Sequence, residues 1–334
     1  MFKQNFKNKS ILVTGGTGSF GKKFVSEVLK YHSQIKKIVV FSRDELKQFE
    51  MSKIYSPEKF KKLRYFLGDV RDKNRLQRAL KDIQIVIHAA ALKQVPIAEY
   101  NPFEFIQTNV LGAQNLIEAC LDSKVENLIA LSTDKAVSPI NLYGATKLCA
   151  DKLFISAKNM SGNKKIKFSV VRYGNVTASR GSIIPFLKSL KNSDYLPITH
   201  KDMTRFNISL DDAVNLVSYA INNNIGGEIF VPKLPSFKIV DLAKTIYPNK
   251  RIKFIGIRDG EKIHEELINA DESLNTIDIG DYYVVLQNKK DKKICDYYLK
   301  KFKGSFLKEQ ISYNSNNANK LSIQDIKSII KKSK

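Results

Sequence analysis

Short apolar segments rich in β-branched residues alternate with segments of helical periodicity along the first half of the chain. The apolar segments predict strands at 11–14, 37–42, 63–67, 84–88, 127–132 and 168–172. Between them, apolar residues recur every three to four positions, which predicts helices at 21–30, 45–55, 73–80, 102–121 and 141–160. Strands that alternate with helices form parallel βαβ units covered on both faces. The sequence therefore predicts an α/β fold with a doubly wound, mostly parallel sheet.

The pattern changes after Asn175, where elements become shorter and prolines interrupt them. We interpret this part as a smaller, C-terminal substrate-binding domain. Residues 226–232 form one more strand-like run, which we expect to return to the main sheet. The last residues are rich in Asn and Ser and then form a basic amphipathic helix, capped by Ser322, to which we assign no catalytic role. The predicted domains are therefore 1–178 with 207–232, 179–206 with 233–311, and a tail at 312–334.

The composition is that of an ordinary soluble globular protein. Of the 334 residues, 43% are hydrophobic and 27% are charged, and no apolar run approaches the roughly 18 residues of a membrane span. The polar, basic start lacks the apolar stretch of a secretion signal, so we expect a cytoplasmic protein that does not bind membranes. The three cysteines and four histidines lack metal-ligand spacing, and we expect no metal.

The formal net charge of +23 raises nucleic acid as a partner. However, the lysines are spread along the chain, and no segment is arginine-rich or interleaved with aromatic residues. We therefore favour an enzyme for anionic small molecules, with no nucleic-acid partner. A non-catalytic regulator that senses a dinucleotide or binds DNA is the alternative from a different functional class.

A glycine-rich turn, residues 14–21, links the first expected strand to the first expected helix. Glycines at 15, 18 and 21 permit a tight turn, close backbone approach to a pyrophosphate, and close packing of helix on strand. The helix N-terminus adds partial positive charge. We interpret this segment as the dinucleotide site of a Rossmann fold.

The end of the second strand indicates which dinucleotide is bound. An acidic residue there would hold a ribose 2′-hydroxyl, whereas this chain has Ser42 and Arg43, with Lys47 one turn later. These groups favour the extra phosphate of NADP, although Asp44 keeps NAD as an alternative. Asp69, after the third strand, could accept a hydrogen bond from adenine or cap the following helix.

A polar cluster at 132–135 follows the fifth strand, and Tyr143 and Lys147 lie beyond it at i and i+4 of a helix. Lys147 beside the Tyr143 hydroxyl favours a phenolate that acts as a base, as in hydride-transfer enzymes. Asp134 offers a general acid and Lys135 a general base. The base role requires an amine, and we expect Lys93, Lys147 and an oxidised nicotinamide to lower the pKa of Lys135 toward roughly 7 to 8.

With these residues in place, the chain resembles the extended short-chain dehydrogenase/reductase superfamily through residues 14–21, 68–70, 88–91, Asn109 and the Tyr143/Lys147 pair. More closely, it resembles the inverting UDP-N-acetylglucosamine 4,6-dehydratases that begin pseudaminic acid synthesis for flagellin glycosylation. The specific matches are residues 42–47, 91–93, 132–136, 141–147, 172–176 and 203–206. One motif differs from the family pattern: residues 258–262 read Arg-Asp-Gly-Glu-Lys, with Asp259 where the family has proline.

The resemblance implies the site residues. The catalytic residues would be Thr133, Asp134, Lys135, Tyr143 and Lys147. The cofactor-binding residues would be Gly15, Thr17, Gly18, Ser19, Phe20, Gly21, Ser42, Arg43, Lys47, Asp69, Val70, Ala89, Lys93, Tyr143 and Lys147. The residues that bind UDP-N-acetylglucosamine would be Lys93, Asn175, Arg180, Ser182, Ile183, Ile184, Pro185, Thr199, Arg205, Arg258 and Glu261.

The resemblance also implies inversion at sugar carbon 5 and assembly as a homo-oligomer. The enzyme alternatives are a nucleotide-sugar 4-epimerase and a capsule-type dehydratase that also epimerises carbon 5. A 4-epimerase needs no acid/base pair beyond Tyr143 and Lys147, so Asp134 and Lys135 argue against it.

Overall fold

A twisted sheet forms the centre of the protein. The computed structural model describes residues 6–162, 164–177 and 182–332, and within them ten strands form one sheet in the order β16-β14-β15-β10-β6-β5-β4-β1-β2-β3. Neighbouring strands from β3 to β10 pair in parallel. These parallel strands are β1 (Ser10–Thr14), β2 (Lys37–Ser42), β3 (Leu63–Leu67), β4 (Ile85–His88), β5 (Asn127–Thr133), β6 (Lys167–Tyr173) and β10 (Glu228–Pro232).

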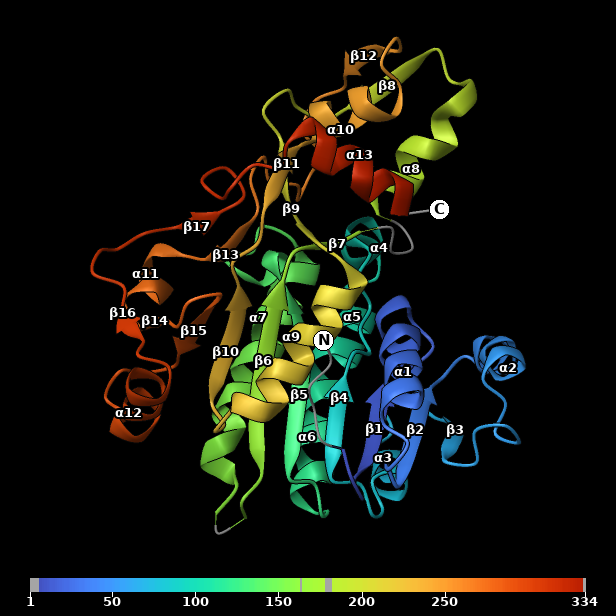
Figure 1. Ribbon diagram of the computed structural model, residues 1–334, viewed down its shortest axis with the longest axis vertical. Helices are drawn as coiled ribbons and strands as arrows, with labels where there is room; N and C mark the ends of the chain where they lie inside the picture. The colour runs from blue at the N-terminus through green and yellow to red at the C-terminus, as the bar shows by residue number, and fades with distance from the viewer. Residues whose placement is uncertain (1–5, 163, 178–181, 333–334) are drawn as a thin grey trace.

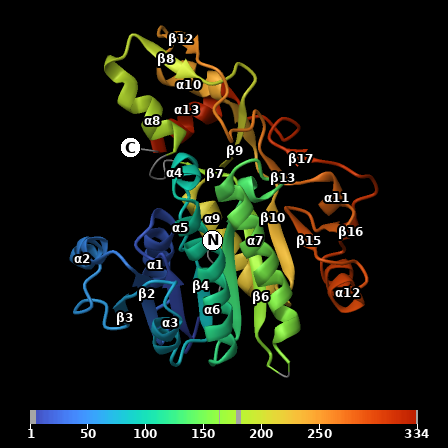
Figure 2. The same cartoon turned by 180° about the vertical axis from the view of Figure 1, so that it is seen from behind.

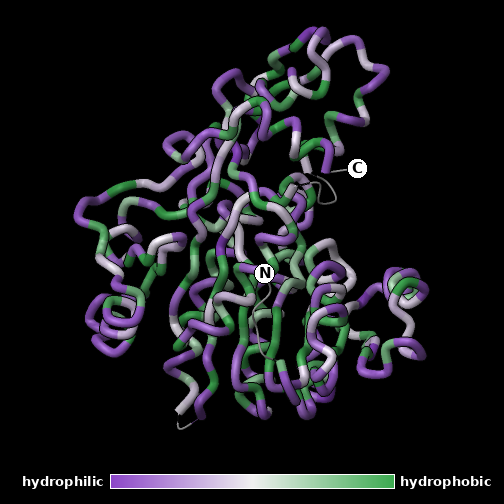
Figure 3. Tube along the Cα trace, viewed as in Figure 1, coloured by the Kyte–Doolittle hydropathy of each residue, from purple (hydrophilic) through white to green (hydrophobic). Residues whose placement is uncertain are grey.

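Helices cover both faces of this sheet. The helices α1 (Ser19–Tyr31) and α9 (Leu210–Asn223) pack together on one face, in front in Figure 1. The helices α3 (Lys73–Ala79), α6 (Gly112–Leu121) and α7 (Leu142–Ser156) cover the other face, which Figure 2 shows. Hydrophobic residues follow the strands in Figure 3, because strands buried on both faces are apolar along their whole length. The predicted doubly wound α/β fold is confirmed.

Side-chain caps fix where several helices begin, because the first turn of a helix leaves amide groups without backbone acceptors. Asp44 caps α2 (Glu45–Ile54), Asp72 caps α3, Asn141 caps α7 and Ser209 caps α9. Two short helices, α4 (Val95–Tyr100) and α5 (Pro102–Phe105), lead into a π-helix at Ile106–Leu111 that runs directly into α6.

The sheet extends beyond β10 with antiparallel strands. β15 (Tyr282–Leu286) pairs with β10, β14 (Thr276–Asp278) with β15, and β16 (Ser305–Phe306) with β14. Helix α12 (Lys292–Lys301) connects β15 to β16, and α11 (Ala270–Ser273) precedes β14. The predicted smaller domain included 276–306, and these pairings correct that boundary, because the apolar run 283–286 extends the main sheet by pairing with β10.

A second lobe lies above the carboxyl ends of the strands in Figure 1. It contains α8 (Ile183–Ser189), β8 (Tyr195–Ile198), β12 (Arg251–Phe254), α10 (Ile239–Ile246) and α13 (Ile323–Lys332), and Leu187, Leu242 and Ile326 meet in its core. As predicted, Ser322 caps α13, because its Oγ accepts from the Asp325 amide at 3.1 Å. The tail helix thus packs into this lobe. Short strands link the lobes: β7 (Asn175–Val176), β9 (Thr204–Ile208), β11 (Ser236–Lys238), β13 (Glu266–Ile268) and β17 (Tyr313–Asn314).

Among the described residues, no helix is both long enough and apolar enough to cross a bilayer.

Candidate active site

A cleft of about 640 Å³ opens at the carboxyl ends of the parallel strands. The strand order reverses between β1 and β4, since β2 and β3 lie on one side and β5 and β6 on the other. Such a switch point leaves a crevice in doubly wound sheets, where ligands bind. Its walls include the residues that directly follow these strands, such as Gly15, Gly68 and Ala89.

The glycine-rich turn forms the floor of this cleft. Gly15 has a φ of +62°, and a Cβ on it would lie 2.8 Å from the backbone of Ala89. A Cβ on Gly21 would lie 2.5 Å from the backbone of Gly16, so α1 can approach the turn only with glycine there. Gly18 is the N-cap of α1 and brings no side chain to the amides of the first turn. These amides and the helix dipole fit a diphosphate.

Every residue predicted to bind the cofactor lies in the wall of this one cleft. They are Gly15, Thr17, Gly18, Ser19, Phe20, Gly21, Ser42, Arg43, Lys47, Asp69, Val70, Ala89, Lys93, Tyr143 and Lys147.

The end of the cleft at β2 and β3 is rich in cations. Arg43 is half exposed, and its Nη1 lies 3.8 Å from Asp69 Oδ2. The carboxylate of Asp44 caps α2 and pairs with the Lys47 ammonium. Asp69 does not cap α3, since Asp72 does, and instead pairs with Arg71 at 2.8 Å. Burial alone would raise the pKa of Asp69, but the hydrogen bonds from Arg71 hold it below its ordinary value.

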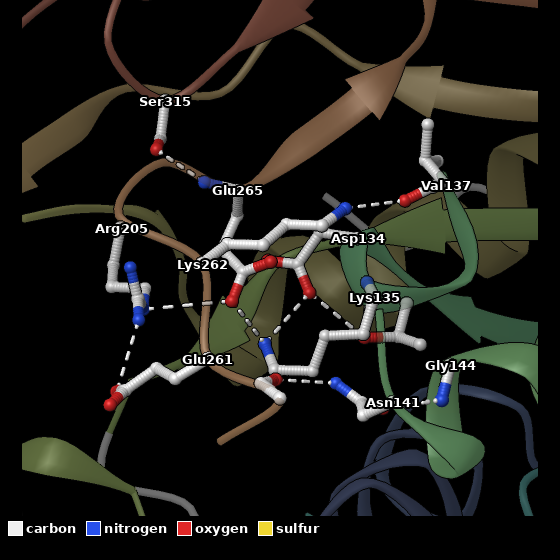
Figure 4. A network of polar contacts seen from close by, with 12 residues as sticks. Asp134, Lys135, Val137, Asn141, Gly144, Arg205, Glu261, Lys262, Glu265 and Ser315 are labelled. Carbon is white, nitrogen blue, oxygen red and sulfur yellow. Dashed lines mark hydrogen bonds and ion pairs between the residues drawn. The ribbon is translucent and has the colours of Figure 1, made fainter. Parts of the chain in front are cut away.

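The cluster at the end of β5 places an acid and an ammonium in the cleft (Figure 4). Asp134 begins a short 3-10 helix, Asp134–Ala136, and its Oδ1 accepts from Thr133 Oγ1 at 2.9 Å and from Lys135 Nζ at 3.1 Å. Lys135 Nζ also lies 2.9 Å from Glu265 Oε1. Gly144 allows α7 to start against this loop, because a Cβ there would lie 2.2 Å from the Lys135 carbonyl oxygen.

The surroundings of Lys135 differ from the sequence-based expectation. Burial would lower the pKa of Lys135, but the adjacent negative charges of Asp134 and Glu265 raise it above its ordinary value. The prediction that cationic neighbours lower this pKa is therefore wrong, since the nearest charged groups are carboxylates. Burial raises the pKa of Asp134, and the charge of Glu265 adds to that rise. Asp134 thus suits a group that carries a proton.

Tyr143 and Lys147 both lie in the cleft wall, although they are held differently from what we expected. The Lys147 ammonium donates to the Leu131 carbonyl at 2.8 Å, and burial lowers its pKa. Burial also raises the pKa of Tyr143 to about 12, while the positive charge of Lys135 and a hydrogen bond with Thr133 oppose that rise. The cation that favours ionisation of Tyr143 is therefore Lys135, whereas we had expected Lys147.

Asn109 ties the wall of the cleft to α7. This buried residue of the π-helix donates to the Leu92 carbonyl at 2.9 Å and accepts from the Leu92 amide at 2.9 Å. Its Nδ2 also donates to Thr146 Oγ1 at 3.0 Å. The segment after β4 is thereby fixed to the helix that carries Tyr143.

Three residues of the predicted substrate set, Lys93, Asn175 and Ser182, line the cleft. The Ser182 hydroxyl is buried and has no hydrogen-bond partner among the described residues, so it is available to a ligand. Arg180 lies outside the residues that the structure describes.

The other predicted substrate residues do not line this cleft. Ile183, Ile184 and Pro185 belong to α8, where the Ile184 side chain packs in the core of the second lobe. Thr199 follows β8, and Arg258 is exposed in the loop after β12.

Arg205 and Glu261 also lie outside the cleft wall. Arg205 is buried and pairs with Glu261 at 3.3 Å and with Glu265 at 3.7 Å. The predicted substrate contacts of Arg205 and Glu261 stay a prediction, and in this structure the guanidinium pairs with carboxylates of its own chain.

Glu265 was not among the predicted site residues, although it contacts the predicted base Lys135 directly. Its side chain is 3% exposed. An isolated β-bridge pairs Thr204 with His264, and this pairing brings Glu265 next to Arg205. No spacing in the sequence links position 265 to position 135. The adjacent Arg-Asp-Gly-Glu-Lys motif was the available signal, and it drew attention to Arg258 and Glu261 instead.

Comparison with known proteins identifies relatives over nearly the whole chain. Residues 11–287 match the family described as polysaccharide biosynthesis protein. The chain is 52% identical over 318 residues to a UDP-N-acetylglucosamine 4,6-dehydratase (inverting) from Campylobacter jejuni subsp. jejuni serotype O:23/36 (strain 81-176), covering 93% of this chain and 94% of the relative. It is 43% identical over 332 residues to a UDP-glucose 4-epimerase from Rickettsia bellii (strain OSU 85-389), covering 97% and 96%.

Solved structures share the fold. Pen from Bacillus thuringiensis superposes with a TM-score of 0.86 at 35% identity, covering 98% of both chains. The dTDP-glucose 4,6-dehydratase DesIV from Streptomyces venezuelae, solved with NAD bound, superposes with a TM-score of 0.67 at 21% identity, covering 76% of this chain and 86% of that chain. The extent of these matches shows that the chain belongs to the polysaccharide biosynthesis protein family, in one family with the inverting 4,6-dehydratase of Campylobacter jejuni.

Proposed function

We propose that this protein is a UDP-N-acetylglucosamine 4,6-dehydratase that inverts carbon 5 of the sugar. The observation that carries the proposal is the hydrogen-bonded pair of Asp134 and Lys135 in the same cleft as Tyr143 and the glycine-rich turn. Dehydration across carbons 5 and 6 needs one group that gives a proton and one that takes a proton. The 52% identity to an enzyme of that name supports the same assignment.

NADP is the cofactor that we propose, and when bound it would accept a hydride from carbon 4 and return it to carbon 6. The turn from Gly15 to Gly21 would hold the diphosphate, since added side chains would fill that space. Arg43 would pair with the 2′-phosphate. The carboxylate of Asp44, which would otherwise favour NAD, caps α2 and pairs with the Lys47 ammonium. The bound NAD of a solved neighbour supports a nicotinamide cofactor in general.

Tyr143 is the proposed base for the hydroxyl on carbon 4, with Thr133 as its hydrogen-bonding neighbour. The phenol needs a nearby cation because burial raises its pKa to about 12. Lys135 provides that charge, and Lys147, which donates to the Leu131 carbonyl, would contact the nicotinamide ribose.

Asp134 is the proposed general acid and Lys135 the general base. The hydrogen bond of 3.1 Å between them lets one proton pass from Nζ to Oδ1, so that an N–H bond breaks and an O–H bond forms. The pair then consists of a carboxylic acid and an amine. The amine removes the proton from carbon 5, and the acid protonates the hydroxyl on carbon 6, which leaves as water. Once carbon 6 has its hydride back, carbon 5 takes a proton from water on the face opposite to Lys135, and this inverts the centre. The raised pKa of buried Asp134 favours the transfer from Nζ to Oδ1, whereas the carboxylates that raise the pKa of Lys135 oppose it.

An epimerase is the second candidate, because a relative at 43% identity is named UDP-glucose 4-epimerase. Exchange of the carbon 4 configuration uses Tyr143 and the cofactor alone. It therefore leaves the Asp134–Lys135 pair without a chemical role.

The test is incubation of the purified protein with UDP-N-acetylglucosamine and NADP, followed by NMR of the sugar. A 4-keto-6-deoxy product with the inverted carbon 5 supports the proposal. A product that keeps the carbon 6 oxygen and inverts only carbon 4 identifies an epimerase, and a retained carbon 5 refutes inversion.

Two broader assignments belong to the same proposal. We expect the product to enter pseudaminic acid synthesis for flagellin glycosylation, which coupling to the next enzymes of that route would test. We also expect a homo-oligomer in solution, which sedimentation analysis would test.

A further inference from the structure

Residues 260–266, which belong to the part of the chain beyond the parallel sheet, are fastened to the loop that carries Asp134 and Lys135 (Figure 4). Asn141 Nδ2 donates to the Gly260 carbonyl at 2.8 Å, and Lys262 Nζ donates to the Val137 carbonyl at 2.7 Å. The third contact joins charged side chains, because Glu265 Oε1 lies 2.9 Å from Lys135 Nζ. Two of these contacts only brace the loop, whereas the third reaches the reacting amine.

Glu265 is held rigidly on both its backbone and its side chain. Its amide donates to Ser315 Oγ at 3.0 Å, and its carbonyl accepts from the Ser315 amide at 2.7 Å. Its side chain is 3% exposed, and Arg205 Nε lies 3.7 Å from Oε1. The other oxygen, Oε2, is buried and has no hydrogen-bond partner among the described residues. A carboxylate in this position cannot move away from Lys135 to reach solvent.

The charges around this contact come from four segments. Asp134 lies beside Lys135, Tyr143 faces it from α7, and Arg205 reaches Glu265 from β9. Lys262 adds a positive charge from the segment of Glu265 itself. The nearby carboxylates of Glu261 and Glu266 pair with Arg205 and bond to the Ser138 hydroxyl, respectively. Arg205 is thus shared between Glu261 and Glu265, while Lys135 faces two carboxylates at hydrogen-bond distance.

We propose that Glu265 is a positioning residue that holds the Lys135 ammonium against Asp134 and sets the pH range in which this pair carries its one exchangeable proton. The inference rests on the proposed dehydratase function. A negative charge 2.9 Å from Lys135 disfavours loss of the last proton from the pair, and it also favours uptake of a second proton by Asp134. Both limits of the active pH range are therefore raised by Glu265.

The experiment compares kcat as a function of pH for the wild type and Glu265→Gln. Glutamine keeps the size of the side chain and an oxygen that accepts from Lys135, but it removes the charge. We expect both limbs of the kcat profile to move to lower pH, the alkaline limb by roughly 1 to 3 pH units. KM should change less than about threefold, because Glu265 does not line the cleft.

Two further variants separate charge from shape. Glu265→Asp keeps the charge and should leave the limbs nearer to their wild-type positions than Glu265→Gln does. Glu266→Gln makes the same change of charge at the next residue, whose carboxylate accepts from Ser138 and Ser312, and should leave both limbs within about 0.3 pH units. Thermal unfolding of each variant shows whether it is folded, and a structural defect alone would lower the amplitude without moving the limbs.

A folded Glu265→Gln variant whose limbs stay in place, or one matched by Glu266→Gln, overturns the inference. This failure differs from failure of the proposed function. If wild-type protein forms no 4-keto-6-deoxy sugar, the function is wrong; if it forms that sugar and only the pH profiles coincide, Glu265 has no such role.

Discussion

Replacement of Arg172 by methionine should destabilise the protein strongly. Arg172 lies on β6 and is fully buried, and its guanidinium bridges two parts of the chain. Nη1 donates to Glu272 at 2.8 Å and to the Leu267 carbonyl at 3.0 Å, while Nη2 lies 3.4 Å from Asp151. The charge is therefore shared between α7 and the segment after β13, and both carboxylates depend on it.

The magnitude follows from what the substitution leaves behind. Methionine fills much of the space but leaves Asp151, which is 1% exposed, without its counter-ion, and Glu272 without its forked partner. Removal of one partner of a buried ion pair costs about 3–5 kcal/mol, because the remaining charge stays desolvated. That is a large part of the roughly 5–15 kcal/mol by which folded proteins are stable.

Urea unfolding measures this effect, followed by circular dichroism because the chain contains no tryptophan. Arg172→Lys is the matched control: it keeps a positive charge but not the fork, and it should lose less stability than Arg172→Met. A loss below about 1 kcal/mol for Arg172→Met would refute the reasoning, since it would mean that the two carboxylates do not need the guanidinium.

Two other predictions concern the cofactor and pH. Arg43→Ala should weaken NADP binding by about 10- to 100-fold, as expected for loss of a charged hydrogen bond, and leave NAD binding within about threefold; titration calorimetry that shows equal losses would contradict the assigned 2′-phosphate contact. Burial lowers the pKa of His88 to about 3, so the unfolded chain takes up a proton below about pH 6.5 while the folded protein does not. Stability from neutral His88 is therefore complete above that pH and falls by up to about 1.4 kcal/mol per unit toward pH 3. Between pH 7 and 5.5 the wild type should lose about 1 kcal/mol more than His88→Asn, and equal losses in urea unfolding would argue against this.

The sequence predicted the parallel sheet closely because its strands are continuous apolar runs that can be recognised in the sequence. The run at 37–42 is observed without change as β2, and 127–132 is observed as β5, which ends one residue later. These segments are apolar on both faces, so the pattern does not depend on distant partners. Strand β14 gave no such signal. It is three residues long, and its place in the main sheet follows from pairing with β15.

The cleft residues were also predictable, because glycines and polar residues at the ends of successive parallel strands must meet at one edge. The charge state of Lys135 was not. Its pKa depends on Glu265, which lies 130 positions later and reaches Lys135 only through the folding of the second part of the chain. Likewise, Arg205 looked like a diphosphate ligand because forked donors suit phosphate, whereas the fold places Glu261 and Glu265 beside it.

The central claim is that Lys135 exchanges a proton with carbon 5 of the sugar. It is tested most directly by running the reaction in deuterium oxide with wild-type protein and with Lys135→Ala, and by locating deuterium with NMR. The account predicts deuterium on an inverted carbon 5 with the wild type, and none there with Lys135→Ala, although that variant still binds NADP. Undiminished deuterium at carbon 5 with Lys135→Ala would contradict it.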